Sequence, residues 1–79
     1  MAKYIRNVER AFAQIRLGET PAQVERERVN EVLENARCYL EDAKYYRKRN
    51  MWETSLATIA YCEGLLDALR ILGLVEFSW

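Results

Sequence analysis

Two carboxylates in the C-terminal half of the chain have a spacing that could support cation or phosphate chemistry. Glu63 and Asp67 are four residues apart, so a helix would place them on one face, with Arg70 one turn further on. Such a pair can hold a divalent cation beside a phosphate, as a site acting on a phosphorylated small molecule would require. The alternative is an ion-pair stripe neutralised by Arg70, or by Arg37 from a neighbouring helix. We expect the stripe, because like charges at this spacing disfavour a helix unless a cation lies nearby.

A basic segment with interleaved tyrosines lies near the middle of the chain. It contains four cations and two tyrosines, in the order Lys44, Tyr45, Tyr46, Arg47, Lys48 and Arg49. Cations beside aromatic stacking surfaces are what single-stranded nucleic acid binds. Acidic residues precede the segment, however, and basic residues at the end of a helix complement its dipole. We therefore expect dipole complementarity and intramolecular pairing, with weak nucleic-acid or anionic-ligand binding as the alternative.

Histidine is absent from the 79 residues, and twelve Lys and Arg residues are balanced by twelve Asp and Glu residues. The missing imidazole excludes Ser-His and Cys-His nucleophiles, His-based metal sites and a histidine pH switch. The zero net charge removes the basic field of a dedicated duplex-binding domain. The sequence also contains no glycine-rich phosphate loop and no nucleophile elbow. We expect a protein that is not an enzyme and that uses no cofactor or metal.

The two cysteines, Cys38 and Cys62, are too few and too far apart for a zinc cluster or a disulfide framework, which is typical of a reducing compartment. Cys38 falls on a polar helix face and Cys62 on an apolar one, so we expect both to be unlinked. Charges interrupt every apolar run before about 20 residues, and the first residues lack the apolar stretch of a secretory signal. We expect a cytoplasmic protein without a membrane span.

Three amphipathic helices are expected to position these residues, at about 2–17, 21–49 and 52–72. Apolar residues recur at about 100° per residue in each of them. Short connections make sequential helices antiparallel neighbours. The sequence therefore predicts one all-α domain spanning 1–79, an up-and-down three-helix bundle with a short apolar tail at 73–79.

Residues that end or begin helices separate these segments. Gly18 suits the left-handed position after the first helix, and Thr20 and Pro21 suit the N-cap and first position of the second. Asn50 can end the second helix or cap the third, and Gly73 can close the third.

The third helix differs from the other two because it is apolar nearly all round, apart from a narrow wedge that contains Glu63 and Asp67. Such a helix is buried on more than one side. Ala60, Gly64 and Ala68 recur every four residues and form a stripe that another helix could approach closely. We expect this stripe to pack inside the bundle, and a second copy of the chain is the alternative neighbour.

The apolar tail alternates, so that Val75, Phe77 and Trp79 would share one side if it is extended. We expect the tail to fold back as a lid over the open end of the bundle. The alternative is an exposed anchor for a partner chain, since aromatic residues dominate binding hot spots.

The segments 39–46 and 55–73, joined by a polar turn through Asn50, resemble a small archaeal family known only as domain of unknown function 357. The pattern A-Y-x-E-G-L-L-D-A-L-R at 60–70 is the most specific part, and the resemblance spans about 30–79. It implies a three-helix bundle, an archaeal cytoplasmic source and no established activity. A looser similarity to ribonuclease-related helical hairpins carries no chemistry over, because those enzymes use an Arg followed by a His.

These observations together predict a non-enzymatic protein-interaction or self-association module that works through the third helix and the tail. The expected partner is a protein or a second copy of the chain, with nucleic acid the weaker expectation and no membrane partner. A carboxylate site acting on a phosphorylated small molecule is the third and most remote reading. The candidate interaction residues are Lys44, Arg47, Lys48, Arg49, Glu63, Asp67, Val75, Phe77 and Trp79.

Overall fold

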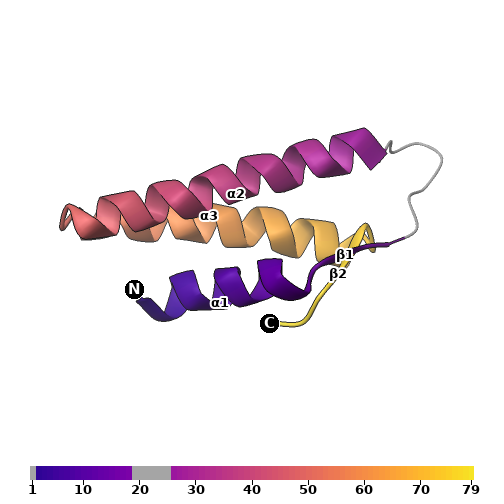
Figure 1. The fold of residues 1–79 in the computed structure, drawn as a ribbon, viewed down its shortest axis with the longest axis horizontal. Coiled ribbons are helices and arrows are strands. Elements are labelled where there is room, and N and C mark those ends of the chain that lie inside the picture. The colour runs from indigo at the N-terminus through magenta and orange to yellow at the C-terminus, as the bar shows by residue number, and fades with distance from the viewer. Residues whose placement is uncertain (1, 19–25) are drawn as a thin grey trace.

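Three packed helices make up most of the chain. The computed structural model describes residues 2–18 and 26–79, so the predicted cap at Thr20 and Pro21 lies outside the described residues. The helices are α1 (Ala2–Gln14), α2 (Arg26–Lys48) and α3 (Trp52–Ile71). They run up, down and up along an elongated molecule of 43 × 20 × 16 Å (Figure 1). The predicted all-α three-helix bundle is confirmed.

The most extensive helix interface is between α2 and α3, which form an antiparallel hairpin. The shorter α1 packs against both of them (Figure 1). Asn50 has a φ of 60°, a left-handed conformation that Asn tolerates, and it ends α2. Met51 is the N-cap residue of α3, without a side-chain capping bond. Its backbone N–H donates to the carbonyl of Tyr46 at 2.9 Å. Asn50 therefore terminates α2 and does not cap α3.

The core lies where the apolar stripes of the three helices meet. Val8 of α1, Cys62 and Leu66 of α3 are each 0% exposed. Two polar side chains are also buried at the hairpin interface, and both are hydrogen-bonded to α2. The Ser55 hydroxyl donates to the carbonyl of Ala43 at 2.7 Å, and the Cys62 thiol donates to that of Ala36 at 3.0 Å. These hydrogen bonds join α3 to the backbone of α2 at two positions along the hairpin.

The first helix is shorter than predicted. It ends at Gln14, and strand β1 (Arg16–Leu17) replaces the expected last helical turn. This strand pairs antiparallel with β2 (Val75–Glu76), with Arg16 opposite Glu76 and Leu17 opposite Val75. The backbone of β1 forms hydrogen bonds with β2 in the tail. A further turn of α1 would use the same backbone groups within the helix and prevent this pairing.

Gly18 has a different role from the predicted left-handed one. The glycine with a positive φ is Gly73, at 76°, and it ends α3 as predicted. Gly18 instead donates its N–H to the carbonyl of Leu74 at 2.9 Å, and a Cβ at this position would collide with the carbonyl oxygen of Gly73. Glycine is required at position 18 because two backbone segments approach too closely for a side chain.

The tail folds back over the end of the bundle. Leu74 and Val75 are buried, and Phe77 is half-buried against the core. Gln14 holds Ser78, whose carbonyl accepts from Nε2 at 2.6 Å and whose N–H donates to Oε1 at 3.3 Å. The predicted lid is therefore present.

Candidate functional site

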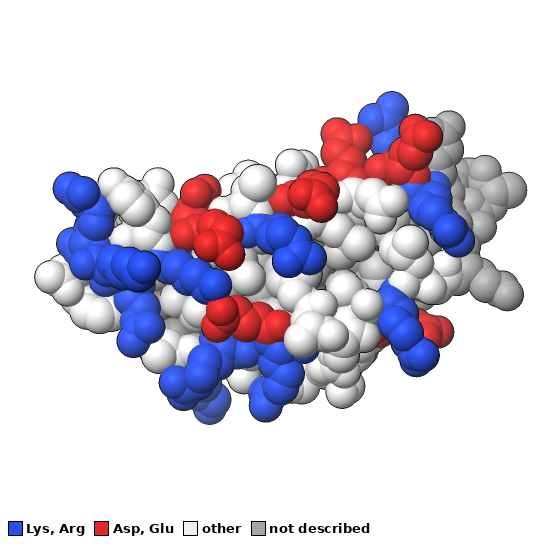
Figure 2. All heavy atoms as spheres, in the orientation of Figure 1, with Lys and Arg blue, Asp and Glu red and all other residues white. Residues whose placement is uncertain are grey.

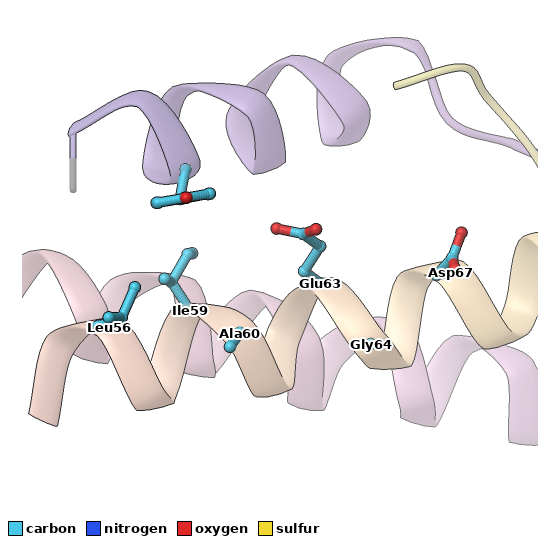
Figure 3. Close-up of a pocket in the computed structure, with 7 residues that line it drawn as sticks. Leu56, Ile59, Ala60, Glu63, Gly64 and Asp67 are labelled. Carbon is cyan, nitrogen blue, oxygen red and sulfur yellow. The ribbon is translucent and has the colours of Figure 1, made fainter. Parts of the chain in front are cut away.

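A groove between α1 and α3 contains both predicted carboxylates (Figure 3). It has a volume of about 400 Å³ and is lined by Tyr4, Leu56, Ile59, Ala60, Glu63, Gly64 and Asp67. Figure 3 shows Glu63 projecting from α3 towards α1, with Asp67 on the same side of α3 one turn further along. The helical spacing thus brings the two acids to one groove, as the sequence predicts.

Asp67 is already engaged by groups of its own chain. Its Oδ1 accepts from Nε and Nη2 of Arg70, at 3.1 and 2.8 Å, and from the indole N–H of Trp79 at 3.1 Å. The hydrogen bond from Trp79, followed by that from Arg70, lowers the pKa of Asp67. The carboxylate therefore holds the tail to α3.

Glu63 is half-buried and has no ion pair or hydrogen bond with any other described residue. The predicted pairing with Arg37 is wrong. Arg37 faces α1 from a second groove, between α1 and α2, where its guanidinium lies 4.4 Å from the centre of the Phe12 ring. Within the described ranges, no three His, Cys, Asp or Glu side chains are grouped as a metal site would need. The groove thus offers one free carboxylate instead of a pair.

Replacing Trp79 with Phe is expected to raise the pKa of Asp67. Among the interactions that favour the ionised carboxylate, the hydrogen bond from the indole N–H has the largest effect. A depressed pKa stabilises the folded state above the unfolded pKa, and this stabilisation is lost as the pH falls through the folded pKa. The difference in melting temperature between wild type and Trp79→Phe should therefore shrink as the pH falls through the pKa of Asp67. Carbon-detected NMR titration of the carboxyl group checks the shift, and an unchanged pKa would show that the indole bond is not formed in solution.

Lys44 is used inside the bundle. Its Nζ lies 2.7 Å from Oε2 of Glu9 on α1 and 3.5 Å from Oε1 of Glu41. The hydrogen bond with Glu9 raises the pKa of Lys44 despite the opposing effect of burial. This cation joins α1 to α2, as the expectation of intramolecular pairing requires.

The other three predicted cations lie at the end of the molecule where α2 turns into α3. Arg47, Lys48 and Arg49 are all exposed. Lys and Arg side chains gather at this end, on the left of Figure 2. None of the three forms an ion pair in the described part of the chain. The predicted pairing therefore holds for Lys44 and fails for these three residues.

The predicted tail residues are largely occupied by the fold. Val75 is 1% exposed, and Phe77 is half-buried with its ring 4.9 Å from that of Trp79. Trp79 keeps 38% of its surface exposed while its indole binds Asp67. The exposed part of Trp79 is therefore the main apolar surface that the tail offers to a partner.

The small-residue stripe is exposed, so the expectation that it packs inside the bundle is wrong. Ala60, Gly64 and Ala68 are all exposed, and a Cβ at position 64 would meet nothing within 4 Å. The opposite side of α3, with Ile59 and Leu66, is the buried one. We name the exposed side the α3 face, made of Ala57, Ala60, Tyr61, Gly64, Ala68, Ile71 and the adjoining Leu72.

Both thiols are free, with Cys38 exposed and Cys62 buried, as predicted. Burial, with a smaller contribution from Glu63, raises the pKa of Cys62 to about 11. A protonated, buried thiol is a packing group and a poor nucleophile.

Three further residues matter in the structure and have no role predicted from the sequence. Tyr4 forms a wall of the α1–α3 groove, and Trp52 lies half-exposed beside the basic segment. Ser55 is fully buried at the hairpin interface. The signal for Ser55 was its helical spacing, since it shares the angular position of the buried residues Ile59 and Cys62.

Comparison with known proteins gives a family and no activity. No curated protein and no solved structure matches the chain significantly. No described helix is both long and apolar enough to cross a bilayer. A family model described as "Protein of unknown function (DUF357)" matches residues 3–75 and so includes α1, which lay outside the resemblance read from the sequence. The chain therefore belongs to the DUF357 family, as the pattern at 60–70 predicted.

Proposed function

We propose that the protein is a non-enzymatic helical module of the cytoplasm that docks a partner helix on the α3 face. The partner helix belongs to another protein or to a second copy of the chain. The open space at Gly64 is the observation that carries this proposal.

Gly64 leaves open space on the surface of the described bundle. Glycine inside a helix costs about 1 kcal/mol relative to alanine, and a Cβ at position 64 would contact nothing in the bundle. The missing side chain leaves room for a group that approaches α3 from outside. Ala60 and Ala68 on either side of Gly64 have small side chains, and Ala60 and Gly64 also line the α1–α3 groove, so such a helix can come close.

The residues around Gly64 have the composition of an interface centre. Tyr61 is 57% exposed, Ile71 70% and Leu72 68%. The cores of interfaces are depleted of charge and enriched in aromatic residues. Asp67, at the edge of the α3 face, is already bound to the tail. Tyr61 contacts the Tyr39 ring of α2, at 4.9 Å between ring centroids, and its exposed part remains available to a partner together with Ile71 and Leu72.

A charge placed on the α3 face tests this proposal. Ala60→Glu is expected to weaken self-association or partner capture by more than about tenfold, because the new carboxylate would be desolvated without a cation. Ala13→Glu, at an exposed alanine of α1, is the matched control and should behave as wild type. Light scattering after gel filtration reports self-association, and affinity capture with mass spectrometry reports other partners. A monomeric wild type whose captured partners are all retained by Ala60→Glu would refute the proposal.

A further inference from the structure

The end of the molecule where α2 turns into α3 has unbalanced positive charge (Figure 2). Arg47 and Lys48 are exposed and have no acidic partner among the residues described. Arg49 contacts an aromatic ring instead, with its guanidinium 5.5 Å from the centre of the Tyr45 ring. Lys44 is neutralised by α1, so three cations remain available to an anion from solution.

The same end exposes large aromatic and apolar side chains. Trp52 is 49% exposed, Tyr45 54% and Met51 43%. Trp52 is the first residue of α3, so the turn places its indole next to the last cations of α2. Exposed aromatic rings beside unpaired cations are the combination that binds single-stranded nucleic acid, because bases stack on rings while phosphates pair with cations.

Trp52 lines two hollows that also share Asn50. The first, of about 450 Å³, is lined by Arg47 and Lys48, by Ile5 of α1, and by the paired Glu9 and Lys44, whose charges offset each other. The second, of about 390 Å³, contains Glu53, which forms no ion pair with a described residue, and is the less favourable side for a phosphate. The first is large enough for a small planar group. A nucleotide base could stack on the indole in this hollow. Arg47 and Lys48 could then pair with its phosphate, and the Asn50 amide could form a hydrogen bond with the edge of the base.

We propose that this end of the molecule binds single-stranded nucleic acid, with Trp52 as the stacking surface and Arg47, Lys48 and Arg49 as phosphate ligands. Duplex DNA is a poorer fit, since its bases are already stacked and duplex readers neutralise more phosphates than three cations can. An anionic bilayer is a poorer fit too, because a flat surface cannot fill the hollow beside Trp52.

The proposal is tested with fluorescently labelled oligo(dT) of about twelve nucleotides, a length typical of such sites. Anisotropy titrations at increasing salt should give a slope of log K against log[salt] of about −2, from about −0.7 for each of three phosphates. Trp52→Ala should weaken binding by about tenfold or more. Arg47→Gln and Lys48→Gln should each reduce the magnitude of the slope by about 0.7.

Three further variants serve as controls. Arg26→Gln makes the same charge change at the opposite end of α2 and should leave binding unchanged, as should Ala60→Glu on the α3 face. Trp52→Phe keeps an aromatic ring and should recover most of the affinity. Circular dichroism checks that each variant is folded. Because Trp52 and Arg47 are exposed, we expect their substitution to leave the core intact.

Several results would overturn the proposal. The first is that oligo(dT) does not bind at low salt. The second is that a duplex of the same length binds with the same affinity as oligo(dT). The third is that Trp52→Ala binds oligo(dT) as tightly as wild type does. Sedimentation with phosphatidylglycerol vesicles in place of oligo(dT) binding would assign this end to an anionic membrane surface instead. Because the α3 face lies outside this site, none of these results bears on helix docking.

Discussion

Deletion of residues 75–79 is expected to unfold most of the protein at room temperature. The deletion removes β2, the buried Val75 and the half-buried Phe77. It also uncovers Val29 and Leu69, which pack against the tail in the second apolar cluster. The lid is therefore part of the core of the bundle.

The expected loss is large compared with the total stability. Fully burying a Val or Phe side chain contributes about 1.5–3 kcal/mol, so losing the buried Val75 and the half-buried Phe77 costs about 2–4 kcal/mol. A single core in a chain this short rarely supplies more than about 3–5 kcal/mol. Thermal melts followed by circular dichroism should show loss of the cooperative transition in the truncated protein.

A shorter deletion is the matched control. Removing only residues 78–79 leaves Val75 and Phe77 in place and should lower the melting temperature much less, since Trp79 is 38% exposed. If deletion of 75–79 instead preserved the melt and abolished only association, the tail would be an anchor and the lid interpretation would be wrong.

The α2–α3 hairpin could be predicted because its signals are local. Apolar residues recur with a helical period along each helix, and Asn50 and Gly73 end the helices at residues that adopt the left-handed conformation. The bounds of α3 differ from the prediction by one residue. Local patterns were sufficient wherever a helix was long enough to repeat them.

The strand pair could not be predicted in the same way. β1 and β2 are each two residues long, too short for an alternating pattern to be distinct from a helical one. Their pairing also joins opposite ends of the chain. The alternation of the tail predicted an extended segment on the bundle, but nothing in it identified Arg16–Leu17 as the partner.

The surroundings of α3 show what an apolar pattern cannot specify. Its composition predicts burial on more than one side, and α2 with α1 covers only the side of Ile59 and Leu66. An apolar sequence pattern indicates that a helix face is covered by some neighbour. It does not indicate whether that neighbour is part of the same chain or of a partner. The sequence therefore predicts that Gly64 packs inside the bundle, whereas it lies exposed in the structure.

The basic end of α2 was recognised only in part for a related reason. Its cations are adjacent in sequence, but their partners are not. Lys44 pairs with Glu9 of α1, whereas Arg47 and Lys48, which line the same hollow with Trp52, form no ion pair with a described residue. Which charges are neutralised depends on how far the N-terminal half of α1 reaches along the hairpin, and helical periodicity does not specify that position.

Gly18→Ala is expected to destabilise the protein by about 2–3 kcal/mol, as overpacking of a close contact does. The new Cβ would collide with the carbonyl oxygen of Gly73, and a backbone atom cannot rotate away as a side chain can. Relief requires β1 to move from β2, which would break the bond from Gly18 N–H to Leu74 and lift the lid. For a domain of this size the melting temperature should fall by roughly 10–20 °C.

Gly64→Ala is the matched comparison, because it makes the same chemical change where the Cβ has free space. Alanine is the better helix former by about 1 kcal/mol, so this variant should melt at a higher temperature than wild type. Opposite signs for the two substitutions would show that Gly18 is required by the fold and Gly64 is not. If Gly18→Ala melted like wild type, the close approach of residues 18 and 73 would not exist in solution. A destabilised Gly64→Ala would mean that α3 has a neighbour at this position within its own chain, and the case for docking a partner helix there would fall.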